Sequence, residues 1–279
     1  MTFTTLIPAD DLRTLLAGPT PPLLLDCSFE LTDPGAGERA YAGGHLPGAL
    51  YAHLDRDLSA PKTGRNGRHP LPSREVFAAT VGRWGVTPGV QVVTYDAQGG
   101  AFAARAWWML RWLGHRAVAV LDGGLQAWTA AGGTLQTQTP PPSAQPPYPA
   151  GAAAMPTIDV DTLARSSSAW TIVDARPAER YRGEVEPMDP VAGRIPGALN
   201  RAHRTNLDAD GRFRPAADLR REFLALAADP SRVVHQCGSG VNACHNLLAM
   251  THAGLAGSTL FPGSWSEWCA DPSRPVARG

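Results

Sequence analysis

Short apolar runs, several of which end in a polar residue, alternate along this chain with stretches of helical period. The runs cover residues 23–26, 90–95, 117–122, 170–174 and 232–235, and they have the length and flanking residues of buried strands. Helical patterns cover residues 103–113, 219–226 and 243–253, and Gly254 is expected to end the last of them. Strands that alternate with helices predict an α/β fold with mainly parallel sheets.

Two further helices have features that predict their surroundings. After Pro72, Ser73 is expected to cap a helix with Val76, Phe77 and Val81 on its inner face. The helix AARAWWMLRWL ends at Gly114, and its tryptophans are expected to pack in the interior rather than to form a ligand cage.

The second half of the chain repeats the first. The turn GHLPGA at 44–49 returns as GRIPGA at 193–198, and Asp26, Asp96 and Trp128 correspond to Asp174, Cys237 and Trp268. A segment rich in proline separates the copies and is expected to act as a semi-rigid linker. We therefore expect an N-terminal domain at 1–140, a linker at 141–156 and a C-terminal domain at 157–279.

The composition narrows the possible partners and locations. The chain has 279 residues, of which 43% are hydrophobic, enough for two cores. Its 25 basic and 25 acidic residues form no basic run, which argues against nucleic acid or a membrane surface as a partner. Without a leader pattern or an apolar run of about 20 residues, a cytoplasmic protein is expected. The four cysteines lack C-x-x-C spacing, so we expect no zinc site.

One stretch, RVVHQCGSGVNACHNLLAMTHAG, combines a strand, a tight loop and a helix, with Cys237 at the junction. Loop N–H groups and the positive end of a helix dipole would converge there and stabilise an anion, which makes Cys237 a candidate thiolate nucleophile. Gly238 and Gly240 permit the tight backbone path. The alternative is a cysteine that only fills space in the core. The corresponding residue of the first copy, Asp96, cannot perform thiol chemistry, so only the second copy has a candidate nucleophile.

These motifs, together with LDGG at 121–124 and GSWSEW at 263–268, resemble the tandem-domain rhodanese family of sulfurtransferases over essentially the whole chain. The resemblance implies two rhodanese-like domains, each a mainly parallel sheet flanked by helices, of which only the second is catalytic. It also implies transfer of a sulfane sulfur through a Cys237 persulfide, without a cofactor or metal. The acceptor would be cyanide, a thiol or a thioredoxin-like protein.

The loop is informative about the sulfur donor. CGSG resembles the loop of 3-mercaptopyruvate sulfurtransferases, whereas members that prefer thiosulfate typically carry basic residues at the positions of Gly238 and Ser239. We therefore expect mercaptopyruvate, with thiosulfate as the alternative. Mercaptopyruvate enzymes often carry an arginine directly after the Glu186-Pro187 pair, but Met188 stands here.

The resemblance also assigns roles to residues outside the loop. Ser239 would join His69 and Asp55 in a relay like that of serine proteases, with Asp57 as the alternative carboxylate. Arg180, and with weaker support Arg182, would hold the donor's anionic group. Further contacts to the donor are expected from the loop itself, at Gly238, Gly240, Val241 and Asn242.

Two other classes of function share parts of this pattern. Phosphatases of the rhodanese-like fold need the sequence Cys-x5-Arg, but the arginine position is Ala243 here. Non-catalytic rhodanese-like modules usually lack the cysteine, which the second copy retains. Both alternatives are therefore weaker than sulfur transfer.

Overall fold

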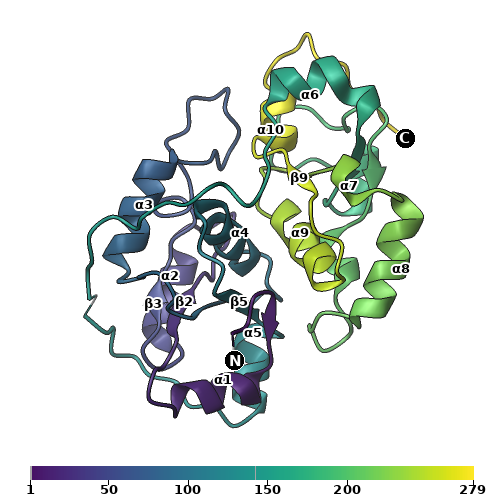
Figure 1. The fold of residues 1–279 in the computed structure, drawn as a ribbon. Helices are drawn as coiled ribbons and strands as arrows, with labels where there is room; N and C mark the ends of the chain where they lie inside the picture. The colour runs from purple at the N-terminus through teal and green to yellow at the C-terminus, as the bar shows by residue number, and fades with distance from the viewer. Residues whose placement is uncertain (1, 142) are drawn as a thin grey trace. The chain divides into compact units, whose positions relative to one another are not determined.

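The computed structural model describes residues 2–141 and 143–279, which form two compact units (Figure 1). The first unit contains residues up to 59, residues 72–154 and residues 209–213. The second contains residues 60–71, 155–208 and 214–279. Each unit thus includes a short segment from the other half of the sequence, and residues 60–71 fold with the C-terminal half.

The helices and strands follow the alternation of the sequence. The first unit contains β1 (Leu6–Ile7), α1 (Ala9–Leu16), β2 (Leu23–Asp26), α2 (Ala36–Gly43), β3 (Leu50–Tyr51), α3 (Arg74–Arg83), β4 (Val92–Tyr95), α4 (Ala103–Leu113), β5 (Val118–Leu121) and α5 (Gly124–Ala130). The second contains α6 (Val160–Ser166), η1 (Ser167–Ala169), β6 (Thr171–Asp174), α7 (Ala178–Arg182), β7 (Leu199–Asn200), η2 (His203–Asn206), α8 (Ala216–Leu226), η3 (Pro230–Arg232), β8 (Val233–Gln236), α9 (Ala243–His252), β9 (Thr259–Leu260) and α10 (Ser264–Trp268). Among the described residues, no helix combines the length and apolarity needed to cross a membrane.

The two sheets share one topology. Their strand orders are β1-β5-β4-β2-β3 and β7-β6-β8-β9, and every strand pair is parallel. The order β5-β4-β2-β3 of the first sheet matches β9-β8-β6-β7 of the second. A single parallel bridge between Thr157 and Leu260 stands where the first sheet has β1. The predicted parallel α/β fold is confirmed, and the internal repeat extends from the sequence to the strand order.

The expected strands are present; β2 has the expected bounds, and β4, β5, β6 and β8 differ from the expected runs by one or two residues at their ends. The run at 90–95 forms a strand only from Val92, because the Val90 N–H donates to the Thr87 carbonyl at 3.2 Å and closes a turn. The cores form where these strands meet their helices. Each unit has a cluster of buried residues there. The cluster of the first unit contains Trp128 with Val93, Ala119 and Leu121. The cluster of the second unit contains Trp268 with Val234 and Phe261.

The helix after Pro72 forms as expected but buries a different face. Ser73 caps it by accepting a hydrogen bond from the Val76 N–H at 3.3 Å. Phe77 and Val81, one helical turn apart, are fully buried, as predicted. The prediction was wrong for Val76, which is 59% exposed. Val81 follows Val76 by five positions, which is not a whole number of helical turns, so the two side chains point to different sides of the helix.

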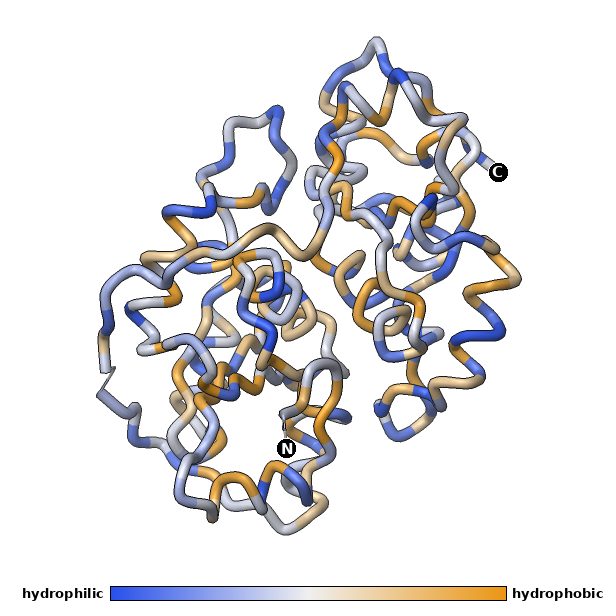
Figure 2. The backbone as a smooth tube through the Cα atoms, viewed as in Figure 1, coloured by the Kyte–Doolittle hydropathy of each residue, from blue (hydrophilic) through white to orange (hydrophobic). Residues whose placement is uncertain are grey.

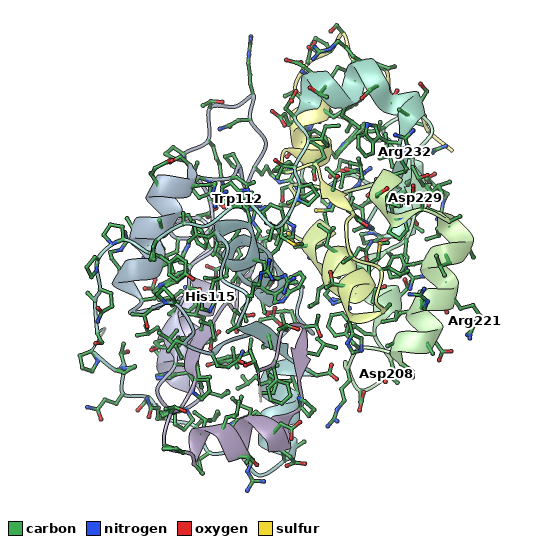
Figure 3. All side chains as sticks on the ribbon, in the orientation of Figure 1. Trp112, His115, Asp208, Arg221, Asp229 and Arg232 are labelled. Carbon is green, nitrogen blue, oxygen red and sulfur yellow. The ribbon has the colours of Figure 1, made fainter. Side chains whose placement is uncertain are left out.

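The tryptophan-rich helix α4 lies in the interior, as expected. Trp107 and Trp108 are fully buried, and the Trp107 indole donates to the Thr4 carbonyl at 2.9 Å. Trp112, labelled in Figure 3, is partly exposed and stacks on Trp108 with ring centroids 5.9 Å apart. These contacts explain the tryptophans by packing.

The proline-rich segment is attached to the first unit. Two of its backbone N–H groups donate to carbonyls of α3: that of Gln145 to Gly82 and that of Tyr148 to Ala78. The Gly151 N–H donates to the carbonyl of Leu113, the last residue of α4. A Cβ atom at Gly82 would lie 2.4 Å from the Pro146 carbonyl oxygen, so glycine is required for this close approach. The segment therefore packs on helices as well as joining the two copies.

In the second unit, α8 is amphipathic and α9 is buried. Hydrophobic and hydrophilic residues alternate along α8 (Figure 2): Leu219 and Phe223 are buried, while Arg221 points outward and pairs with Asp218 at 2.8 Å (Figure 3). By contrast, every residue from 243 to 250 is buried, so α9 forms the centre of its unit. Gly254, with φ of +74°, follows its end as predicted.

A buried histidine on β8 predicts sensitivity of this unit to acid. Burial lowers the pKa of His235 to about 3, so it stays neutral in the fold at pH values where the unfolded chain, with its ordinary pKa near 6.5, binds a proton. The stability that depends on neutral His235 is present above pH 6.5 and is lost as the pH falls toward 3. We expect the free energy of unfolding to fall with a slope of about 1.4 kcal/mol per pH unit for this group. Denaturant unfolding of the wild type and His235→Leu between pH 7 and pH 4 tests this. An equal pH dependence of the two proteins would contradict it.

Candidate active site

Cys237 lies at the carboxyl end of β8, which runs between β6 and β9. The residue is 2% exposed, and the Ser239 N–H points at its Sγ from 3.5 Å. The helix α9 begins six residues later, at Ala243. This is the predicted arrangement of strand, loop and helix, with the sulfur near the start of a buried helix. Cys244, one turn into that helix, donates its S–H to the Gly240 carbonyl at 3.3 Å.

The two loop glycines are fixed by close contacts. Gly240 has φ of +77°, and a Cβ atom there would lie 2.2 Å from the Pro262 carbonyl oxygen. At Gly238, a Cβ atom would lie 2.7 Å from Nη2 of Arg68 and 3.5 Å from both terminal nitrogens of Arg180. Gly240 thus serves the turn, whereas Gly238 makes room for guanidinium groups beside the cysteine.

Ser264 supports the loop from α10, and the sequence analysis did not identify it. Its Oγ accepts a hydrogen bond from the Cys237 N–H at 3.0 Å and donates one to the Phe261 carbonyl at 3.0 Å. It has φ of +54°, the left-handed conformation that favours glycine. The corresponding residue in the first copy is Gly124, with φ of +56°. A strained serine in the place of a glycine indicates that its hydroxyl is needed beside Cys237.

His69 and Ser239 meet beside the cysteine. His69 Nδ1 lies 2.7 Å from Ser239 Oγ, and both residues are 5% exposed. The segment that carries His69 is anchored in the second unit, because the Arg68 N–H donates to Ser266 Oγ at 3.0 Å. The structure therefore brings Cys237, Ser239 and His69 together, as the sequence predicted.

The two candidate carboxylates, Asp55 and Asp57, lie in the first unit. Asp57 Oδ2 accepts from the His53 N–H at 2.9 Å, and Oδ1 is 3.7 Å from Arg83. Burial raises the pKa of Asp57. The backbone N–H of Asp55 donates to the His53 ring at 3.1 Å. The Asp57 carboxylate is thus engaged in holding its own loop.

The two arginines of the ERYRG motif point to different surroundings. Arg180 is 14% exposed and lies over the loop at Gly238, paired with Glu186 at 2.6 Å. Arg182 is 44% exposed and pairs with the exposed Glu184 at 2.6 Å. Of the two expected donor-binding arginines, the structure brings Arg180 to the cysteine loop and leaves Arg182 paired at the surface. Val241 is buried in the loop, and the Asn242 side chain does not cap α9.

A continuous chain of alternating charges runs beside the cysteine loop. Its members, in order of contact, are Asp174, Arg176, Glu186, Arg180, Asp189 and Arg68. Three carboxylates and three guanidiniums balance one another, as groups withdrawn from water require. The sequence analysis named Asp174, Glu186 and Arg180, but it assigned no role to Arg176, Asp189 or Arg68. The sequence does contain one signal for this row of charges: Glu186 and Asp189 lie three positions apart and flank Met188, which places two carboxylates in one short segment.

Burial and the neighbouring charges shift the pKa values of two members of this row of charged side chains, Arg176 and Asp189. Burial disfavours the charge of Arg176, but Asp174 and Glu186 hold the pKa of its guanidinium above the ordinary value. The guanidinium of Arg176 also lies 4.9 Å from the centre of the Trp265 ring. Burial raises the pKa of Asp189 although Arg68 and Arg180 are adjacent.

The corresponding loop of the first unit is closed by its own side chain. The Asp96 carboxylate accepts four backbone N–H bonds at 2.8 Å, from Gln98, Gly100, Phe102 and Ala103. The N–H groups that would stabilise a thiolate therefore hold a fixed carboxylate. This loop carries a carboxylate in place of the thiol, and four of its amides are already engaged by that carboxylate.

The sequence comparisons identify the family. The profile of the rhodanese-like domain matches residues 8–131 and 159–271. The chain belongs to the rhodanese family. Among its relatives, a Pseudomonas aeruginosa protein named "Probable 3-mercaptopyruvate sulfurtransferase" is 49% identical over 264 residues, which cover 92% of each chain. Thiosulfate sulfurtransferase from Gallus gallus is 33% identical over 88% of this chain and 85% of its own. The structure of 3-mercaptopyruvate sulfurtransferase from Leishmania major matches with a TM-score of 0.84 at 31% identity, over 95% of this chain and 74% of that one.

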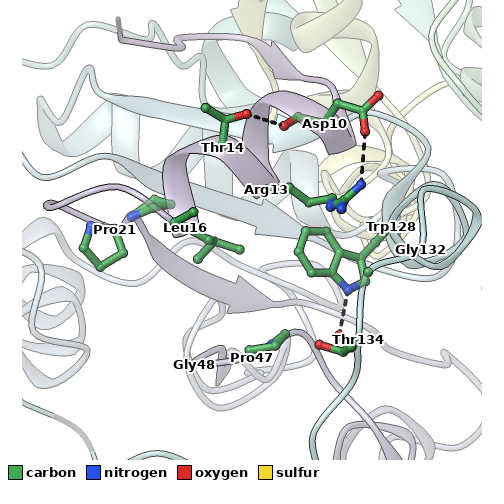
Figure 4. Close-up of a pocket in the computed structure, with 13 residues that line it drawn as sticks. Asp10, Arg13, Thr14, Leu16, Pro21, Pro47, Gly48, Trp128, Gly132 and Thr134 are labelled. Carbon is green, nitrogen blue, oxygen red and sulfur yellow. Dashed lines mark hydrogen bonds and ion pairs between the residues drawn. The ribbon is translucent and has the colours of Figure 1, made fainter.

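A surface hollow in the first rhodanese unit has a different character. It has a volume of about 1140 Å³ and lies beside α1 and the Pro47-Gly48 turn (Figure 4). The Trp128 indole, which donates to the Thr134 carbonyl at 2.8 Å, forms one wall. The lining residues include no cysteine or histidine. Over residues 2–141 and 143–279, no cluster of three or more histidine, cysteine or acidic side chains is arranged to hold a metal ion.

The strained Ser264 leads to a testable order of stabilities. Ser264→Gly and Ser264→Ala both remove the acceptor of the buried Cys237 N–H, but glycine also relieves the left-handed strain of about 1 kcal/mol. We expect Ser264→Ala to be less stable than Ser264→Gly by about that amount, measured by denaturant unfolding. Both variants should slow alkylation of Cys237 by iodoacetamide. Equal stability of the two variants would show that the backbone is not strained.

Proposed function

We propose that this rhodanese-family chain is a sulfurtransferase that takes a sulfur atom from 3-mercaptopyruvate and passes it, through a Cys237 persulfide, to a thiol or to cyanide. The observation that carries the proposal is the hydrogen-bonded pair of His69 and Ser239 in the cysteine loop. The names of the relatives, among which both mercaptopyruvate and thiosulfate sulfurtransferases occur, support the reaction class.

The first half of the proposed reaction forms the persulfide. The Cys237 thiolate bonds to the donor sulfur, and the bond between that sulfur and its carbon breaks. The electron pair of the broken bond goes to the carbon and is delocalised onto the neighbouring carbonyl oxygen as an enolate. Protonation of the enolate gives pyruvate. Stabilisation of the attacking sulfur comes from the loop, where the Ser239 N–H lies 3.5 Å from Sγ.

Ser239 and His69 act on the donor's carbonyl group. Negative charge develops on the carbonyl oxygen as the carbon–sulfur bond breaks, and a hydroxyl held by an imidazole can donate a hydrogen bond or a proton to it. For the carboxylate that orients His69 we propose Asp55, because the Asp57 carboxylate is engaged by the His53 N–H. Thiosulfate has no such carbonyl, so the relay favours mercaptopyruvate over thiosulfate as the donor.

Arg180 is the proposed anchor of the donor's carboxylate, since its guanidinium lies over Gly238 next to the nucleophile. A planar guanidinium can bind a carboxylate through two parallel hydrogen bonds. Arg182 is not retained in this role because it pairs with Glu184 at the surface. Gly238, Gly240, Val241 and Asn242 form the loop backbone around the transferred sulfur.

The second half of the reaction returns the enzyme to its starting state. An acceptor thiolate bonds to the outer sulfur of the persulfide, the sulfur–sulfur bond breaks, and Cys237 leaves as a thiolate. We propose a thiol or a thioredoxin-like protein as acceptor, a non-catalytic role for the first domain and a cytoplasmic location, all on the sequence evidence.

Persulfide formation is directly observable. After incubation with mercaptopyruvate and removal of excess donor, intact-mass spectrometry should show one added sulfur atom on the wild type. Cys237→Ser should show none, whereas Cys244→Ser should behave as the wild type because Cys244 is buried against Gly240. An equal gain of sulfur by wild type and Cys237→Ser would contradict the mechanism.

The relay makes a prediction that separates the two donors. Ser239→Ala and His69→Ala should reduce kcat for mercaptopyruvate by about 10²-fold or more, because the carbonyl loses its hydrogen-bond donor. The effect on thiosulfate should be smaller. Asp55→Asn should follow His69→Ala, with Asp57→Asn as the matched control. Unchanged mercaptopyruvate turnover in Ser239→Ala would remove the relay from the mechanism, and a higher kcat/KM of the wild type for thiosulfate would overturn the choice of donor.

A further inference from the structure

We propose that the first unit carries a binding site for an aromatic anion, a planar ring with a carboxylate or phosphate group, in a second hollow beside α2 and α3. The proposal does not rest on the proposed sulfur transfer. This α2–α3 hollow has a volume of about 550 Å³, within the range of small-molecule pockets, and its residues all belong to the first unit. Three aromatic and three charged side chains form much of its lining: Tyr41, Tyr51, Trp84, Glu38, Arg56 and Arg83.

The aromatic side chains of the α2–α3 hollow form fixed walls. The Tyr41 hydroxyl donates to the Ala49 carbonyl at 2.7 Å. The Tyr51 hydroxyl donates to the Ser28 carbonyl at 2.9 Å, and the centroids of the two phenol rings lie 5.5 Å apart. Trp84 is 7% exposed and is therefore held by the core. Rings that are fixed before a ligand arrives present aromatic surface on which a planar ring can stack at a low entropic cost.

The charged side chains give the hollow an excess of positive charge. Two arginines and one glutamate line it, which leaves one net positive charge. Arg56 pairs with Glu38 at 2.9 Å, and these two side chains are 56% and 52% exposed. Because exposed ion pairs of this kind contribute little to stability, the Arg56 guanidinium can turn toward a bound anion. An aromatic cation would instead meet two guanidiniums of its own sign.

Arg83 retains hydrogen-bond donors for such a ligand. Its Nη2 donates to Thr80 Oγ1 at 3.0 Å. The same nitrogen lies 3.7 Å from Oδ1 of Asp57, a distance too long for a direct hydrogen bond. A guanidinium has five N–H donors in one plane, which suits the binding of a carboxylate or phosphate through two parallel hydrogen bonds. The Arg83 side chain is 61% exposed, so a ligand can reach these donors.

The second copy has the same fold without these binding groups. Tyr51 and Asn200 occupy the same position of the two sheets, where each pairs with a strand-end aspartate. The C-terminal end of α3 is Arg83-Trp84, whereas that of α8, the helix at the same place in the second copy, is Leu226-Ala227. The fold therefore requires neither an aromatic ring nor an arginine at these positions, and ligand binding accounts for their presence in the first copy.

Calorimetric titration of the full-length wild type tests the proposal with matched probes. Indole-3-acetate and adenosine monophosphate combine an aromatic ring with a carboxylate and a phosphate, respectively, and thus distinguish the two kinds of anion. Tryptamine has the ring of indole-3-acetate with the opposite charge, and inorganic phosphate has the charge without a ring. We expect at least one aromatic anion to bind at one site per chain, about tenfold or more tightly than tryptamine and inorganic phosphate.

Variants locate the binding in the α2–α3 hollow. Arg83→Met removes a charged donor, and Tyr51→Asn, the change to the residue of the second copy, removes a stacking surface. Each should weaken binding by about tenfold. Arg83→Met is expected to fold because its side chain is exposed. Arg39→Met is the matched control, since Arg39 is an exposed arginine of α2 that does not line the hollow. It should bind as the wild type, and so should Arg180→Met.

Three results would overturn the proposal. The first is that neither aromatic anion binds more tightly than inorganic phosphate, and the second is that tryptamine binds more tightly than both. The third is an affinity that Arg83→Met and Tyr51→Asn leave unchanged but Arg180→Met abolishes, which would place the ligand at the cysteine loop. Failure of the proposed sulfur transfer would appear separately, as a wild type that gains no sulfur whatever its affinity for these probes.

Discussion

The fold of each half is organised by one electrostatic constraint, the convergence of backbone N–H groups after a central parallel strand. Such a loop is stable only when a negative or hydrogen-bond-accepting group lies among the N–H groups. In the first unit the Asp96 carboxylate accepts four of these bonds and closes the loop permanently. In the second unit the acceptor is the sulfur of Cys237, which receives the Ser239 N–H. The same loop conformation is thus inert when its N–H groups hold a fixed carboxylate, and it is suited to chemistry when they face a thiolate.

The charge chain beside the cysteine loop follows from the same requirement. A site that holds an anionic donor and a thiolate needs positive charge, but guanidiniums withdrawn from water are costly without partners. Asp174, Glu186 and Asp189 supply that partnership and leave the outer faces of Arg180 and Arg68 toward Gly238. The absence of a side chain at Gly238 is therefore as important for this arrangement as the charges are.

Ser264 shows how the two copies diverged at equivalent backbone positions. Gly124 and Ser264 have nearly the same φ, and Leu125 and Trp265 donate the same N–H bond, at 3.0 Å, to the carbonyls of Asp96 and Cys237. Only the second copy places a hydroxyl there, and it accepts the Cys237 N–H. The left-handed strain is tolerated where the sulfur is positioned and is avoided where the loop is inert.

By itself, the sequence determined the alternation of strands and helices, the duplication, the parallel sheets and the position of Cys237 between a strand and a helix, because all of these depend on local pattern and spacing. It also predicted the contact between His69 and Ser239 through a family resemblance, which carries tertiary information. Only the tertiary structure decided that Val76 faces outward, that Arg182 pairs at the surface, and that Arg68 and Ser264 support the cysteine loop. These outcomes depend on which segments pack together across long sequence separations, and no local period or motif encodes such a contact.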